Sequence, residues 1–365
     1  MLHFVHLRPW DIATSPIGQE LRRLGVPHQF LGTPVNLRYR WRVELFLRVY
    51  PLLVVRLLAT ALRSMWSARS SPKAVLVSSD IEAIVFGLVR SMLRRPTLIV
   101  FQTLIVTPRS SRWANLAYMA YWRLILGLID IGVCHARSEI VGYERLFPVH
   151  GHKLVFIPYG TTVNRCSLSS VPPPLDNVPT IVAAGRSGRD YLTLARAVEG
   201  LRCRLTIICD TAGPLRTLPA SEQIEIARTC FDHEYLDRLA HATIVVVPLS
   251  VHDISAGQMV LLQAAALARP VVITRTATTI DYATDGKDAL LVPMGDVATL
   301  RQTLAHLLGN AELRRLLGQA ASDRFVQHHS TEAYIRNLVQ VVQSRLGTAV
   351  SGGHVPGHGV ADPGI

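Results

Sequence analysis

The sequence predicts two doubly wound α/β domains that face each other across a cleft, and three observations lead to this fold class. Short apolar, β-branched runs alternate with helical segments, which is the pattern of parallel sheets covered on both faces. The series of runs occurs twice, on either side of a stretch rich in Ser and Pro at 164–179. The chain has 365 residues, and a single core rarely extends beyond ~250–300 residues. Of these residues 49% are hydrophobic and 18% are charged, which is enough apolar material for large buried cores.

The first series predicts a domain over residues 1–160. It opens with a strand at 2–7, followed by a helix that starts at Ser15-Pro16 with the proline in its first turn. The later strands of this domain are AVLVS (74–78), TLIVF (97–101), IGVC (131–134) and KLVFIPYG (153–160). The stretch NRCSLSSVPPPLDNVP (164–179) then marks the domain boundary.

The second series predicts a domain over residues 161–330. Its strands are TIVAAG (180–185), RLTIICD (204–210), IEIAR (224–228), TIVVVPL (243–249) and PVVIT (270–274). Residues 297–346 read as helical, and we expect the helix at 331–346 to return to the first domain. The remainder, 347–365, is expected to be a disordered tail.

Positive charge is concentrated in the first part of the chain. The formal net charge is +12, and residues 1–160 hold 20 Lys and Arg against 8 Asp and Glu, whereas residues 161–365 hold 18 of each kind. The segment 37–66 mixes Arg, Trp and Tyr with long apolar stretches, and Arg42, Arg56 and Arg63 fall near one face of a helix that Pro51 kinks or splits. We expect this segment to contact a membrane surface. The alternative is a basic amphipathic helix packed on a soluble core.

Other partners and cofactors are not indicated. No uncharged apolar run approaches the ~20 residues of a membrane span, and no nucleic-acid-binding motif accompanies the arginines. The five cysteines are scattered without a CxxC pair, which favours a reducing compartment and no metal. Because Arg8 and Asp11 interrupt the N-terminal apolar run, no signal peptide is visible. We therefore expect a cytoplasmic protein, peripherally attached to the inner face of the membrane, without a cofactor.

The segment SAGQMVLLQAAALARPVVITRT (255–276) predicts an anion site. Ser255 is expected to be the N-cap of a helix, and Gln258 to complete a Ser-x-x-Gln capping box. Ala256 and Gly257 leave the first turn bare, so that backbone amides and the helix dipole favour a phosphate. The alternative is a capped helix with nothing bound.

A second anion-binding segment is AAGRSGRDY (183–191), which follows a buried strand. Arg186 and Arg189 are placed to reach the same anion, because a guanidinium holds phosphate oxygens through paired donors. The alternative is a surface turn with solvated arginines. We therefore assign Arg186, Arg189 and the four residues from Ser255 to Gln258 to a diphosphate.

Over residues 60–345, the chain resembles the retaining GT-B glycosyltransferases of family 4. The similarity lies in HARSEIVGYERLF with KLVFIPYGTTVN, in AAGRSGRDYLTLARAVEGL, and in the segment from Ser255 to DGKDALLVPMGDVATL. It implies two Rossmann-like domains, with Arg186 matching the family's arginine and Arg189 replacing its lysine. The family's two glutamates, eight positions apart, fall on Ser255 and Gln263, and the second implies a contact with the donor ribose. The histidine that the family often has after a middle strand is missing from VFQTLIVTPR, so no catalytic base is assigned.

The resulting hypothesis is a metal-independent, retaining glycosyltransferase. It moves a sugar from a nucleotide-sugar donor, bound on the second domain, to an anionic lipid-linked or polysaccharide acceptor at the basic first domain. Such a role belongs to the synthesis of cell-envelope polysaccharide. The alternatives are a nucleotide-sugar-binding module without turnover, motivated by Ser255 and Gln263, and a nucleotide-sugar epimerase on the same fold.

Overall fold

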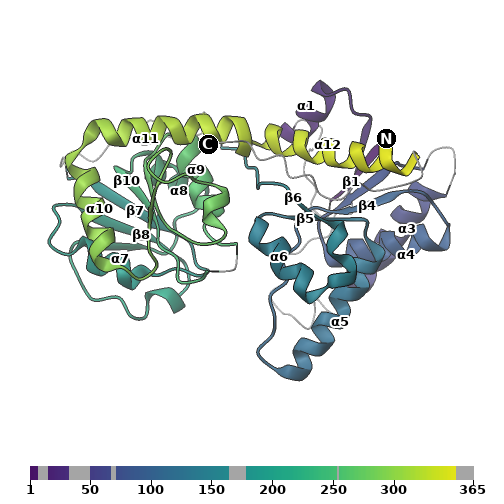
Figure 1. Cartoon of the computed structure of the whole chain (residues 1–365), viewed down its shortest axis with the longest axis horizontal. Coiled ribbons are helices and arrows are strands. Elements are labelled where there is room, and N and C mark those ends of the chain that lie inside the picture. Colours follow the sequence, from purple (N-terminus) through teal and green to yellow (C-terminus); the bar gives the residue numbers. More distant parts are fainter. Residues whose placement is uncertain (7–14, 33–49, 67–70, 164–177, 253–254, 351–365) are drawn as a thin grey trace.

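The computed structural model describes residues 1–6, 15–32, 50–66, 71–163, 178–252 and 255–350, which form two α/β lobes (Figure 1). Each lobe contains a six-stranded sheet in which every pair of neighbouring strands is parallel. Parallel strands need crossover helices, and these cover both faces of each sheet. The predicted fold class is therefore confirmed.

The first lobe has the strand order β2-β1-β3-β4-β5-β6. Its strands are β1 (Leu2–His6), β2 (His28–Gly32), β3 (Ala74–Val77), β4 (Leu98–Phe101), β5 (Ile131–Cys134) and β6 (Leu154–Phe156). Its helices are α1 (Pro16–Arg23), α3 (Tyr50–Met65), α4 (Asp80–Met92), α5 (Arg112–Leu128), α6 (Arg137–Leu146) and the 3₁₀-helix η2 (Pro148–Lys153).

The second lobe has the strand order β12-β11-β10-β7-β8-β9. Its strands are β7 (Thr180–Ala184), β8 (Arg204–Ile208), β9 (Ile224–Ala227), β10 (Ile244–Val247), β11 (Val271–Thr274) and β12 (Leu290–Val292). Its helices are α7 (Tyr191–Val198), α8 (Asp232–Ala240), α9 (Gln258–Ala266), α10 (Val297–Gly309) and α11 (Ala311–Arg324), with 3₁₀-helices η4 (Gly213–Leu215) and η5 (Thr279–Asp281). A π-helical turn, η6 (Phe325–His329), leads into α12 (Thr331–Val350).

The last helix, α12, packs on the first lobe although it follows the second in sequence (Figure 1). Ile335, Leu338 and Val342 are buried in the same cluster as Leu2 and Phe4 of β1. The chain thus crosses between the lobes twice, before β7 and again at η6.

Two strands escape the sequence analysis, β2 and β12. Both are edge strands. β2 (HQFLG) is half polar, and β12 (LLV) is apolar but only three residues long, so neither has the longer apolar run of a central strand. Several predictions fall outside the described residues. These are Leu7 of the first strand, residues 37–49 of the basic segment, residues 164–177 of the boundary and residues 351–365 of the tail.

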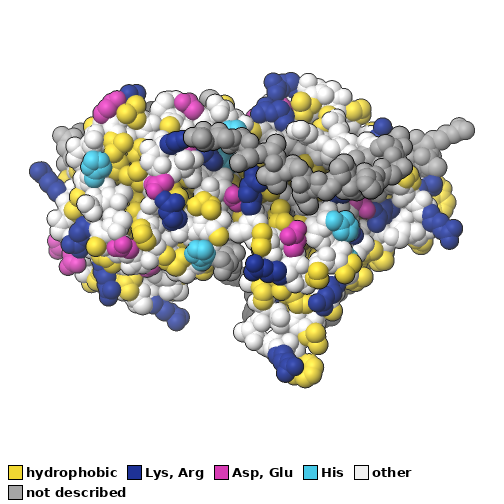
Figure 2. Space-filling view, viewed as in Figure 1, with side chains coloured by type: hydrophobic (Ala, Val, Ile, Leu, Met, Phe, Trp, Pro, Cys, Tyr) yellow, Lys and Arg dark blue, Asp and Glu magenta, His cyan; other side chains and the backbone are white. Residues whose placement is uncertain are grey.

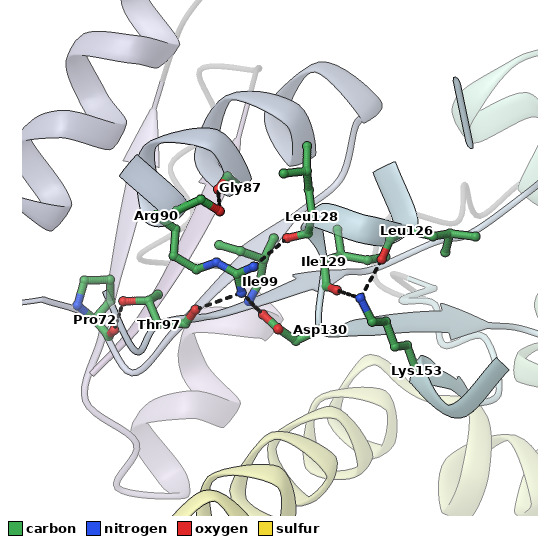
Figure 3. Close-up of polar contacts among 11 residues, drawn as sticks. Pro72, Gly87, Arg90, Thr97, Ile99, Leu126, Leu128, Ile129, Asp130 and Lys153 are labelled. Carbon is green, nitrogen blue, oxygen red and sulfur yellow. Dashed lines mark hydrogen bonds and ion pairs between the residues drawn. The ribbon is translucent and has the colours of Figure 1, made fainter. Parts of the chain in front are cut away.

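The C-terminal end of α5 is fixed by cations from neighbouring elements (Figure 3). Lys153 donates to the carbonyls of Leu126 and Ile129 at 2.7 and 2.8 Å, and Arg90 of α4 donates to Leu128 O and pairs with Asp130. The last turn of α5 has no basic residue of its own, so these side chains satisfy its carbonyls and complement its dipole. The opposite, N-terminal half of α5 projects from the lobe (Figure 1).

Candidate functional site

A cavity of about 540 Å³ lies between the lobes at the carboxyl ends of both sheets. The first lobe contributes Thr103, Ile105, His135 and Tyr159, and the second contributes Arg186–Arg189, Val251 and Ser255–Met259. This is the position at which doubly wound sheets bind ligands. The structure therefore brings together six of the seven site residues that the sequence predicts, and Gln263 does not line this cavity. Among the described residues of its wall there is no carboxylate.

The start of α9 forms one wall of the cavity, but its cap differs from the prediction. Ser255 is not the N-cap. That residue is Gly257, with φ +87°, and the predicted capping box is absent. A Cβ on Gly257 would lie 2.7 Å from Val247 Cγ1, so the chain needs a glycine to pack against β10 and to enter the helix in the left-handed region. The helix consequently starts at Gln258, and the amides of residues 258–260 have no partner within the helix.

Two buried polar atoms at this wall lack a hydrogen-bond partner in the described part of the chain. They are Ser255 Oγ and Gln258 Nε2. Leaving a buried polar group unsatisfied costs about 1–3 kcal/mol. Together with the bare first turn of α9, these atoms offer donors to an anionic ligand.

Arg189 supplies a half-buried cation at the same wall. Its Nε donates to Ala184 O and its Nη1 to Ser187 O, both at 2.8 Å, and the guanidinium lies against Gly185, where a Cβ would come within 2.4 Å of Nη2. No described carboxylate lies within ion-pair distance of Arg189. Burial lowers the pKa of Arg189, with the nearby Tyr191 phenol opposing the shift, yet a guanidinium stays protonated at neutral pH. A half-buried cation that faces a cavity and has no described carboxylate partner suits an anion.

Arg186 lies at the rim of the cavity and is largely exposed. Its Nη1 is 3.4 Å from Asp210 Oδ2, a surface ion pair that contributes little to stability. The side chain is therefore available for a ligand at the edge of the pocket.

Gln263 lies on α9, one to two turns beyond the bare helix start. Its Oε1 accepts a hydrogen bond of 2.8 Å from the Tyr235 hydroxyl of α8. The carbonyl is thus occupied, and the Gln263 amide presents N–H donors. The ribose contact implied by the family resemblance stays a prediction.

His135 and Thr103 are site residues that the sequence analysis misses. Thr103 follows β4 and His135 follows β5, so these adjacent parallel strands bring the two side chains to the same edge. His135 Nδ1 lies 2.9 Å from Ile157 O, and its Nε2 lies 3.2 Å from Thr103 Oγ1. The sequence signal that could have revealed His135 is its position directly after the apolar strand, in IGVCH.

A contact between the lobes is built on Tyr282, which follows η5. Its hydroxyl donates to His135 O and accepts from Tyr159 N, at 2.5 and 2.9 Å. Arg137 at the start of α6 donates its backbone N–H to Asp281 at 2.8 Å. These bonds connect the second lobe to the strand end that carries His135.

The comparisons with known proteins agree with this fold. Residues 178–310, which contain every cationic and helix-start residue of the cavity wall, match the family Glycosyl transferases group 1. The comparison with curated proteins finds no match.

Solved structures with the same two-lobed fold extend over nearly the whole chain. A sucrose-phosphate synthase from Thermosynechococcus elongatus is 16% identical with a TM-score of 0.64, and the match covers 95% of this chain and 99% of that one. A glycosyltransferase from Rickettsia africae is 14% identical with a TM-score of 0.65, covering 94% and 98% of the two chains. HepE from Anabaena, solved with UDP and glucose, is 12% identical with a TM-score of 0.64, covering 94% and 99%.

The architecture defined by the two facing sheets is therefore GT-B. The chain therefore has the GT-B fold, and its second lobe is similar to the glycosyl transferases of group 1.

Proposed function

We propose that this protein transfers a sugar from a nucleotide-sugar donor to an anionic lipid-linked or polysaccharide acceptor, with retention of configuration and without a metal ion. The observation that carries the proposal is the cation cradle. Arg189, Arg186 and the bare start of α9 line one wall of a single cavity of about 540 Å³. Such a wall suits the diphosphate of a donor. The UDP and glucose bound to HepE are further support.

The retaining, metal-independent chemistry is supported by the composition of the wall. Its positive groups are guanidinium and helix amides, which stabilise charge as it develops on a departing diphosphate. No carboxylate is present among the described wall residues to act as a nucleophile, as retention through a covalent intermediate would require. Retention then follows if the departing diphosphate guides the attacking hydroxyl to the same face of the sugar.

The donor reading is tested with a panel of UDP-, GDP-, ADP- and dTDP-sugars, measuring release of the nucleoside diphosphate with and without lipid-linked acceptors. We expect one donor to be turned over, with the same anomeric configuration in the product by NMR. Inversion of configuration would remove the retaining mechanism. Binding without turnover in every combination would favour a donor-binding module, the alternative prompted by Ser255 and Gln263.

Membrane contact is proposed for the outer surface of α3, α4 and α5. These helices lie side by side on the first lobe, and α3 and α5 contain no acidic residue. Hydrophobic side chains that are exposed on this surface are Leu52, Val55, Leu58, Leu88, Met92, Trp113, Leu116 and Leu124. Exposed arginines at 56, 63, 112 and 123 accompany them. In Figure 2 the projection formed by α5 carries hydrophobic and basic side chains at its tip.

This combination suits an anionic bilayer at the cytoplasmic face, with apolar side chains entering the interface and arginines on lipid phosphates. No helix among the described residues is long and apolar enough to span a bilayer. The test compares Leu116→Glu on α5 with Leu316→Glu on α11, which are 58% and 50% exposed in the wild type. We expect only Leu116→Glu to lose co-sedimentation with anionic liposomes, and equal binding by both variants would contradict the assignment.

A further inference from the structure

The wall of the cavity that faces the cation cradle carries neutral polar groups instead of charges. Thr103 is half-buried and its Oγ1 contacts His135 Nε2, while His135 is only 5% exposed. The Tyr159 ring meets the imidazole edge to face, with centroids 5.1 Å apart. A sugar bound between the two walls would present its hydroxyl groups to this side.

The tautomer of His135 follows from its neighbours. A backbone carbonyl only accepts, so the contact of 2.9 Å with Ile157 O places the proton of a neutral ring on Nδ1. Burial lowers the pKa of His135, against the opposing effects of the Ile157 and Gln102 carbonyls and of Glu139, so the ring is neutral at pH 7. Nε2 is then a bare acceptor that faces the Thr103 hydroxyl.

The ring has little freedom to change this arrangement. The backbone N–H of His135 donates to Glu139 Oε2 at 3.1 Å, and its carbonyl accepts from the Tyr282 hydroxyl. The backbone N–H, the backbone carbonyl and the Nδ1 atom of His135 are therefore held by Glu139, Tyr282 and Ile157, which lie on three different segments. The remaining ring nitrogen binds the proton of Thr103.

A threonine hydroxyl has one proton and two lone pairs. Because His135 holds the proton, Thr103 Oγ1 can only accept a hydrogen bond from the cavity. We propose that Thr103 accepts a hydrogen bond from a hydroxyl group of the sugar bound in the cavity, and that His135 is the positioning residue that makes Thr103 an acceptor. The inference rests on the proposed function, and the hydroxyl belongs either to the donor sugar or to a sugar of the acceptor.

The first test uses Thr103→Val, which removes the hydroxyl at nearly constant shape. Calorimetry measures the affinity for the best donor of the panel and for its free nucleoside diphosphate. We expect unchanged affinity for the diphosphate and about 3- to 10-fold weaker donor binding, the range of one neutral hydrogen bond. If the hydroxyl belongs to the acceptor, the KM for the acceptor rises by the same factor and donor affinity is unchanged.

Thr103→Ser is expected to restore the wild-type values, and Thr107→Val serves as a matched control in the same loop, outside this cavity. Unchanged donor affinity and acceptor KM in Thr103→Val would overturn the inference while the proposed function stands. A wild-type protein that binds no nucleoside diphosphate would remove the proposed function and the inference together.

The second test reads the direction of the hydrogen bond with deoxy and deoxyfluoro analogues of the sugar that the first test identifies. Fluorine accepts weakly but cannot donate, so at the contacted position the wild type should bind both analogues equally poorly. In His135→Phe the Thr103 proton is released toward the cavity, and the fluoro analogue should bind more tightly than the deoxy analogue. A wild type that binds the fluoro analogue as well as the parent sugar would show that Thr103 donates, contrary to the inference.

Discussion

Replacing Arg189 by Met separates its structural role from its role toward a ligand. In the free protein the change removes two hydrogen bonds of 2.8 Å, to Ala184 O and Ser187 O, each contributing about 1 kcal/mol. The loss is partly offset, because a half-buried guanidinium without a described carboxylate partner is also removed. We therefore expect the free energy of unfolding to fall by at most about 2 kcal/mol.

Donor binding should respond more strongly. A hydrogen bond between a guanidinium and a phosphate contributes about 1.5–3 kcal/mol, so losing one raises the Kd roughly 10- to 150-fold. Arg189→Lys keeps the charge but not the fork of donors, and its Kd should fall between the wild type and Arg189→Met. Calorimetry gives the Kd, and thermal unfolding with and without donor gives the stabilisation by ligand. Wild-type donor affinity in a folded Arg189→Met would refute the assignment of this wall to a diphosphate.

Three further substitutions probe the remaining parts of the site. Gly257→Ala imposes a left-handed φ on alanine and places its Cβ 2.7 Å from Val247 Cγ1. Thermal unfolding should therefore show that the free energy of unfolding falls by about 1–3 kcal/mol, and donor binding should weaken. Unchanged stability would contradict the packing argument. Arg186→Ala should lower turnover at least ~10-fold without a change in melting temperature, since the side chain is exposed. Asp210→Asn removes the carboxylate that pairs with Arg186 and should keep or improve donor affinity. Gln263→Glu preserves an acceptor for the Tyr235 phenol, so we expect the donor Kd to stay within about 2-fold of wild type or to fall slightly. A loss beyond tenfold would show that the donor needs the Gln263 N–H groups, contrary to a ribose contact through the carbonyl oxygen.

The cation cradle could be found from the sequence because its parts are local. Arg189 and Gly257 each lie within a few residues of the strand end that positions them, so short patterns identify both. The details of the cap could not be found in this way. Ser255 satisfies every local rule for an N-cap, but the close approach of α9 to Val247 on β10 moves the helix start to Gln258.

The opposite wall of the cavity depended on long-range order. Thr103 and His135 are 32 positions apart and meet only because β4 and β5 are neighbours, and His135 gains its tautomer from Ile157 at the end of the next strand. A lone histidine directly after an apolar run, as in IGVCH, does not by itself identify a site.

The sequence by itself determined the two parallel sheets, the excess of positive charge in the first lobe and the segment that carries the bare helix start. These features follow from the hydrophobic period, composition and local backbone preference of short segments. Only the tertiary structure decided which strand ends face each other, that α12 packs beside β1, and which hydroxyl His135 contacts. Such contacts join residues far apart in the chain, and their energies exist only once both sheets have formed and packed.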